Sequence, residues 1–89
     1  MSFAQRIREL RKAKSWSVYD LASAIGVKSP GYVSKIEARG EIPSPEMIIR
    51  LAQALGAEVR ELFDLAKKDK GQQLTHTINK KYDEGYALY

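Results

Sequence analysis

The spacing between two helix signals near the middle of the chain constrains its fold most strongly. Only three residues, the first of them Gly26, separate an amphipathic segment at 17–25 from the Ser29–Pro30 pair. A serine N-cap followed by proline is a signal for the start of a helix. Proline has no N–H, but an N–H at the first helical position would have no partner within the helix in any case. Glycine supplies the left-handed backbone that a sharp corner requires. The spacing therefore predicts two short helices, at 17–25 and 29–39, joined by a tight turn.

Three further segments complete an all-helical pattern. The first begins at Ser2, which is followed three residues later by a glutamine in a capping-box pattern. Another begins at a second serine–proline pair, Ser44–Pro45, and the last carries apolar residues every three to four positions. We therefore predict an all-α, compact five-helix domain over residues 1–70, followed by a short C-terminal tail over residues 71–89.

The composition argues against catalytic and metal-binding chemistry. The chain has no cysteine, and its single histidine, His76, lies in the tail between two threonines, whereas a metal site needs several convergent ligands. No glycine-rich phosphate loop is present. No segment approaches the roughly 20 apolar residues of a membrane span, and the start lacks the apolar region of a signal peptide. We expect a cytoplasmic protein that is not an enzyme, carries no metal or cofactor and contacts no membrane.

The positive charge is concentrated in the first half of the chain. The net charge is +4 overall, but residues 1–40 hold eight basic and three acidic side chains, a balance of +5. Residues 41–69 hold four basic and six acidic side chains, a balance of −2. A one-sided basic surface attracts polyanions, nucleic acid first and anionic membrane second. If charge is the only evidence considered, the alternative interpretation is a solvated basic surface that binds no partner.

Several short motifs in combination resemble the Cro/C1-type helix-turn-helix repressors, the XRE family. They are Ile7-Arg8-Glu9-Leu10-Arg11, Ser17 through Leu21-Ala22, Gly26, Tyr32-Val33-Ser34-Lys35-Ile36-Glu37, Leu51-Ala52-Gln53-Ala54-Leu55-Gly56 and Glu61-Leu62-Phe63. The resemblance covers residues 3–63, about two-thirds of the chain. It implies a lambda-repressor-like domain whose third helix enters the major groove of double-stranded DNA.

Two groups of residues become candidates for DNA binding. Cations beside the turn and at helix ends are expected to neutralise phosphates. These cations are Lys12, Lys14, Lys28 and Arg39. Residues on the exposed N-terminal part of the third helix are expected to contact base edges or position the helix. These residues are Ser29, Gly31, Tyr32, Ser34 and Lys35. Simple solvation is the alternative for the polar members, and core packing is the alternative for Tyr32.

Other positions have a structural interpretation beside a functional one. Ser17 and Ser29 are N-caps first and phosphate ligands second. Many family members carry a phosphate-binding glutamine at the start of the second helix, where this chain has Val18, so that contact is missing or comes from another group. The family's residues that match Arg11 and Glu37 form an ion pair, which implies a partly buried brace between the first and third helices.

The aromatic residue before the second helix also has two interpretations. Trp16 precedes the cap and can pack as a hydrophobic staple against Leu21, four positions into the helix. Stacking of Trp16 and Tyr19 on single-stranded bases is the alternative. We expect Trp16 to pack against the core.

Taken together, these features predict a sequence-specific DNA-binding transcriptional regulator, a repressor, that acts as a homodimer on a palindromic operator. A monomer of this size contacts too few base pairs to compete with non-specific sites, and two half-sites double the contacts. The alternative is a protein-interaction module with the same fold, either an antitoxin that neutralises a partner toxin or a transcription coactivator.

The tail carries the apolar stripe expected of a dimerisation arm. Its members are Leu74, Ile78, Tyr82 and Tyr86. Helical spacing connects them, although the alternation around His76 also permits a short strand, and a frayed end is a further alternative. An unpartnered apolar stripe favours a two-fold partner. If the tail is not the dimer contact, Phe63 and Leu65 on the fifth helix are the next candidates.

Overall fold

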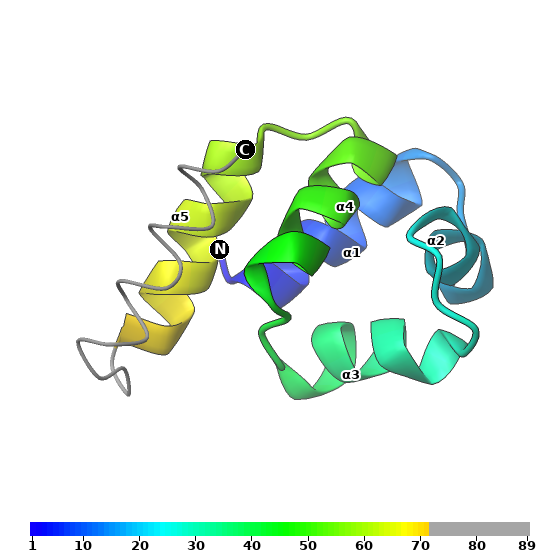
Figure 1. Cartoon of the computed structure of the whole chain (residues 1–89), viewed down its shortest axis with the longest axis horizontal. Helices are drawn as coiled ribbons and strands as arrows, with labels where there is room; N and C mark the ends of the chain where they lie inside the picture. The colour runs from blue at the N-terminus through cyan, green and yellow to red at the C-terminus, as the bar shows by residue number, and fades with distance from the viewer. Residues whose placement is uncertain (72–89) are drawn as a thin grey trace.

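A computed structural model of the chain describes residues 1–71, and this part contains five helices and no strand. The helices are α1 (Phe3–Ala13), α2 (Val18–Ala24), α3 (Pro30–Arg39), α4 (Pro45–Leu55) and α5 (Val59–Gly71). Figure 1 shows α4 crossing in front of α1, with α5 on one side of this pair, α2 on the other side and α3 below them. The predicted all-α class with five helices is confirmed.

Serine N-caps begin four of the helices, as the sequence predicts. Ser2 and Ser17 each accept a 3.1 Å hydrogen bond from the backbone N–H three residues on. The side chains of Gln5 and Asp20 accept 2.8 Å bonds from the two cap N–H groups, which completes a capping box at each helix. Both serine–proline pairs begin helices, α3 and α4, with proline in the first turn.

The turn from α2 to α3 closes through backbone hydrogen bonds around Gly26. Its N–H donates to the Ser23 carbonyl at 3.1 Å, and the Val27 N–H donates to the Ala22 carbonyl at 3.0 Å. Gly26 has a φ of 80°, a left-handed conformation that glycine adopts without strain. This Schellman motif ends α2 and sends the chain directly toward α3.

The same bond pattern ends α1, but with a serine in the left-handed position. The Trp16 N–H donates to the Arg11 carbonyl at 3.2 Å, and the Ser15 N–H donates to the Lys12 carbonyl at 2.9 Å. Ser15 has a φ of 58°. A left-handed conformation costs about 1–2 kcal/mol for a residue with a Cβ. These backbone bonds and the packing of the neighbouring Trp16 against the core therefore accompany a conformation that serine disfavours.

One hydrophobic core receives side chains from all five helices. Its fully buried members include Phe3, Ile7, Leu21, Val33, Ile36, Ile48, Leu51, Leu62, Phe63 and Ala66. Trp16 is partly buried and packs against this core, as expected, and Leu10 also packs against it. The alternative dimer contact through Phe63 is wrong, because its side chain is 2% exposed and fills the core; Leu65 is partly buried.

The end of α5 is tied to the start of α1. The Phe3 N–H donates a 2.7 Å hydrogen bond to the Asp69 carboxylate, 66 residues away in the chain. This bond satisfies one of the free N–H groups of the first turn of α1. The helix itself continues to Gly71, one residue beyond the predicted boundary. The stripe predicted for the tail, at Leu74, Ile78, Tyr82 and Tyr86, lies outside the described residues.

Two other kinds of site are absent from the part of the chain that the structure describes. No helix within residues 1–71 combines the length and hydropathy needed to cross a bilayer. The same residues contain no cluster of three or more metal-ligating side chains.

Candidate nucleic-acid interface

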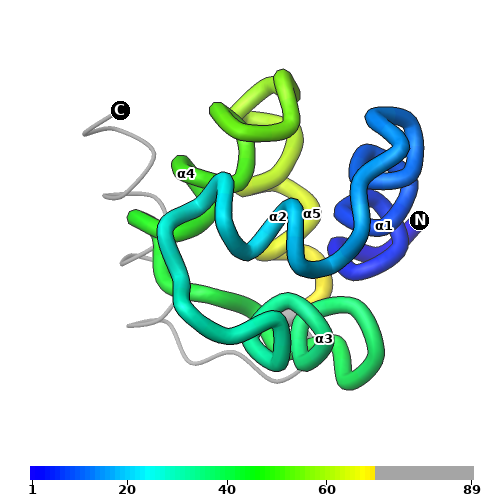
Figure 2. The backbone as a smooth tube through the Cα atoms, turned by 90° about the vertical axis from the view of Figure 1, so that its right-hand side faces the viewer, coloured from blue at the N-terminus to red at the C-terminus, as the bar shows by residue number. Residues whose placement is uncertain are grey.

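The α2–α3 pair forms the core of the candidate interface. The two helices contact each other, and Leu21 of α2 and Val33 and Ile36 of α3 are buried. Burial of these residues leaves the opposite face of α3 exposed, with Ser34 and Lys35 on it. In Figure 2, α2 faces the viewer, with α3 below it and α1 to its right. Together α2 and α3 form a helix-turn-helix with one open face.

The only carboxylate of α3 points away from that open face. The Glu37 side chain is 4% exposed and accepts two hydrogen bonds from Arg11, at 2.8 Å from Nε to Oε2 and at 3.0 Å from Nη2 to Oε1. The Arg8 Nε lies 3.3 Å from Glu37 Oε1. Because these bonds neutralise Glu37 inside the domain, the exposed charges that α3 itself presents are the cations Lys35 and Arg39.

Arg11 joins three parts of the domain. Besides its bonds to Glu37 of α3, its Nη1 donates a 2.7 Å hydrogen bond to the carbonyl of Trp16, in the connection between α1 and α2. Its side chain is 12% exposed. The hydrogen bond to Glu37 raises the pKa of Arg11, against the opposing effect of burial. The guanidinium therefore stays charged and fixes the position of α3 relative to α1.

The four expected phosphate-binding cations all lie on the surface. Lys12 and Lys14 lie at the end of α1, Lys28 precedes α3, and Arg39 ends α3. All four are exposed, and none of them is ion-paired with a residue of the described part. The structure thus places free positive charge at both ends of α3 and at the approach to α2. The phosphate contacts themselves stay predictions.

The expected base-contacting residues fall into two groups. Ser29, Gly31, Ser34 and Lys35 are exposed. A Cβ on Gly31 would lie 3.2 Å from the Ser29 Oγ, so the absence of a side chain at this position leaves room for the N-cap of α3. Ser17 is also exposed, and its hydroxyl caps α2.

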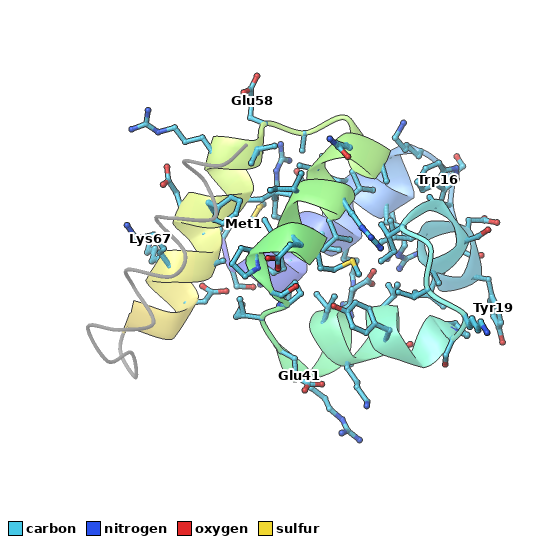
Figure 3. All side chains as sticks on the ribbon, in the orientation of Figure 1. Met1, Trp16, Tyr19, Glu41, Glu58 and Lys67 are labelled. Atoms are coloured by element: carbon cyan, nitrogen blue, oxygen red, sulfur yellow. The ribbon has the colours of Figure 1, made fainter. Side chains whose placement is uncertain are left out.

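Tyr32 differs from the others because its ring is partly buried against the core. Burial is the larger cause of its raised pKa, and the negative charge of Glu41 is the second. Figure 3 shows Glu41 beyond the end of α3. The ring therefore combines core packing with partial exposure, and its contact with DNA stays a prediction.

Some residues of this region were not singled out from the sequence. Arg8 adds a third bond to Glu37, and Arg50 of α4 lies 3.5 Å from the Ile25 carbonyl, where it lines an open groove with Ser23 and Gln53. Their partners are 25 to 29 residues away in the chain. No local pattern reveals such pairs, because each depends on how the helices pack.

Comparison with known proteins supports this geometry. A family model described as Helix-turn-helix matches residues 7–62, a range that runs from within α1 into α5 and includes all of α2, α3 and α4. A search of curated proteins and a search of solved structures gave no match.

Proposed function

The chain belongs to the Cro/C1-type helix-turn-helix (XRE) family of DNA-binding transcription regulators, and from this premise we propose that it binds a specific sequence of double-stranded DNA. The observation that carries this proposal is the inward orientation of Glu37, held by Arg11 at 2.8 Å and 3.0 Å. An exposed carboxylate at this position would repel phosphates. With Glu37 neutralised, α3 can enter the major groove with a cationic and polar face.

The exposed face of α3 has the groups that base recognition needs. Lys35 supplies donors that suit the O6 and N7 acceptors of guanine, and the Ser34 hydroxyl can donate or accept. Gly31 has no side chain, so the backbone of the first turn can approach a base edge closely. In this docking geometry α2 crosses the DNA backbone, with Lys12, Lys14, Lys28 and Arg39 as the cations that neutralise phosphates.

We further propose that the protein acts in the cytoplasm as a repressor and as a homodimer on a palindromic operator. Repression requires only that a promoter be occupied, which DNA binding by itself achieves. A dimer places two copies of α3 about 34–36 Å apart, one helical turn of DNA, and doubles the specific contacts. The extension beyond residue 71, with Leu74, Ile78, Tyr82 and Tyr86, is the proposed dimerisation arm.

Selection of bound duplexes from a random pool, followed by footprinting of the selected sequence, tests the proposed DNA binding. We expect one enriched sequence with inverted half-sites whose centres lie about 10 base pairs apart. Affinity should fall steeply with salt, as phosphate neutralisation requires. A pool without enrichment, together with a protein that co-purifies stoichiometrically, would contradict sequence-specific binding and favour the antitoxin or coactivator function.

Removal of residues 72–89 tests the dimerisation arm. The shortened chain keeps all five helices and the core, so we expect a folded domain by circular dichroism. It should sediment as a monomer and bind the selected operator far more weakly than the full chain. A shortened chain that stays dimeric with full affinity would show that the dimer contact lies within residues 1–71.

A further inference from the structure

The only tryptophan of the chain lies directly beneath a lysine that we expect to contact DNA. The Lys14 Nζ is 5.1 Å from the centroid of the Trp16 ring, within the range of a cation–π interaction. Ser15, which lies between them in the chain, has the left-handed backbone conformation. Trp16 itself is partly buried and packs against the core, whereas Lys14 is exposed.

We propose that Trp16 is a positioning residue that holds the ammonium group of Lys14 for contact with a DNA phosphate, an inference that rests on the proposed DNA binding. A free lysine side chain has many rotamers and loses much of this freedom when it binds. Contact with the indole restricts these rotamers before DNA arrives. The ammonium group has three N–H donors, and it keeps outward ones for a phosphate while it lies over the ring.

The backbone around Trp16 is fixed relative to the DNA-contacting helices. Its carbonyl accepts a 2.7 Å hydrogen bond from Arg11, which also binds Glu37 of α3. The capping box of α2 begins at the next residue, Ser17. In helix-turn-helix docking the first helix of the motif crosses the DNA backbone. The ring therefore holds Lys14 at a set position beside the helix that lies nearest the phosphates.

If Trp16 served only for packing, the contribution of Lys14 to DNA binding would not depend on the indole ring. If the indole only packs against the core, leucine, which is apolar but has no aromatic face, should preserve the contribution of Lys14 to DNA binding. If the face of the ring positions Lys14, that contribution should fall when the ring is replaced. The two roles therefore differ in the coupling between Lys14 and Trp16, measured in DNA affinity.

A double-mutant cycle on the full chain measures this coupling. The variants are Lys14→Ala, Trp16→Leu and the pair, each titrated with the same selected duplex at low salt. We expect Trp16→Leu to raise Kd about 2- to 5-fold, the range of an exposed cation–π contact. The loss caused by Lys14→Ala should be smaller by about the same factor in the Trp16→Leu background. Trp16→Phe, which keeps an aromatic face, should recover part of the affinity.

Lys12→Ala is the matched control, because Lys12 is an exposed lysine two positions before Lys14 and its charge is the same. Its effect should add to that of Trp16→Leu without coupling. An additive cycle for Lys14 and Trp16 would overturn the positioning role. If circular dichroism shows that Trp16→Leu is unfolded, the cycle is run with Trp16→Met, an apolar side chain without an aromatic face, and additivity there has the same consequence.

The same titrations separate this inference from the proposed function. If the unmodified chain binds no duplex, the proposed DNA binding is wrong, and the positioning role falls with it. If the unmodified chain binds its duplex and the cycle is additive, only the role of Trp16 is wrong.

Discussion

The arginines of α1 and the cations around α3 carry the same charge but are used differently. Arg6 pairs with Glu9 and lies 3.3 Å from Glu61 of α5, while Arg8 and Arg11 both bind Glu37 of α3. In contrast, the exposed cations of the candidate interface are not paired with any carboxylate in residues 1–71. They are Lys12, Lys14, Lys28, Lys35 and Arg39. A count of basic residues along the sequence therefore overstates the positive charge that a polyanion can contact.

The division follows the chemistry of the two side chains. The planar guanidinium of Arg11 binds both oxygens of the Glu37 carboxylate, which a lysine ammonium cannot do with the same geometry. Lysine has a compact, strongly hydrated charge on a flexible chain, which suits contact with phosphates at a wet surface. The arginines of α1 therefore connect the helices through ion pairs. The four exposed lysines of the candidate interface and Arg39 keep their positive charges available for contact with DNA.

The largest effect should come from breaking the brace. Arg11→Met leaves Glu37 buried with only the more exposed Arg8, so we expect the free energy of unfolding to fall by roughly 3–5 kcal/mol. Replacement of both partners, Arg11→Met with Glu37→Leu, should recover much of that loss. Urea denaturation of the two single variants and the double variant measures the coupling. Small, additive changes would mean that the pair contributes little to the fold.

A smaller effect is expected at the surface that we propose contacts base edges. Lys35→Ala should cost roughly 1–3 kcal/mol of binding free energy on the selected operator and clearly less on random DNA. Titration of both duplexes by fluorescence anisotropy gives the two values. Equal losses on the two duplexes would assign Lys35 to phosphate contact instead.

The contrast between free and paired cations predicts a difference in salt dependence. Lys28→Ala should lower the magnitude of the slope of log K against log salt by about 0.9, because one phosphate contact is lost. Arg8→Ala is the matched control, since Arg8 is half exposed but lies 3.3 Å from Glu37. Its slope should stay close to that of the unmodified chain. If the two variants change the slope equally, ion pairing does not decide which cations contact DNA.

The smallest effect is expected in the connection between α1 and α2, where Ser15 lies. Ser15 has a φ of 58°, and Ser15→Gly removes the clash of its Cβ in this left-handed conformation. Because glycine also gains freedom in the unfolded chain, we expect a net gain of only about 0.5–1 kcal/mol in stability. Thermal unfolding of both chains measures it, with Ser34→Gly, in the middle of α3, as the control that should destabilise. A loss of stability in Ser15→Gly would show that the serine side chain makes a compensating contact.

Much of the site could be placed from the sequence, because its position follows from where helices start. The spacing from Gly26 to Ser29 predicts the turn, and the periodicity of Val33 and Ile36 predicts which face of α3 is buried. Periodicity distinguishes the buried face of a helix from the exposed face, but it does not determine how far a residue at the border between the two faces is buried. Tyr32 lies on that border, so its partial burial had to come from packing.

The sequence by itself determined the helices of this protein, since an N-cap serine, a first-turn proline and a left-handed glycine act within a few residues. The tertiary structure decided which charges remain free. Arg11 and Glu37 are 26 residues apart and Phe3 and Asp69 are 66 apart. The ion pair of Arg11 and Glu37 was expected only from the family resemblance, whereas Asp69 at the start of α1 was not expected at all. Such contacts form only after α1, α3 and α5 have packed around one core, because the direction of a side chain along a helix says nothing about which distant helix it will meet.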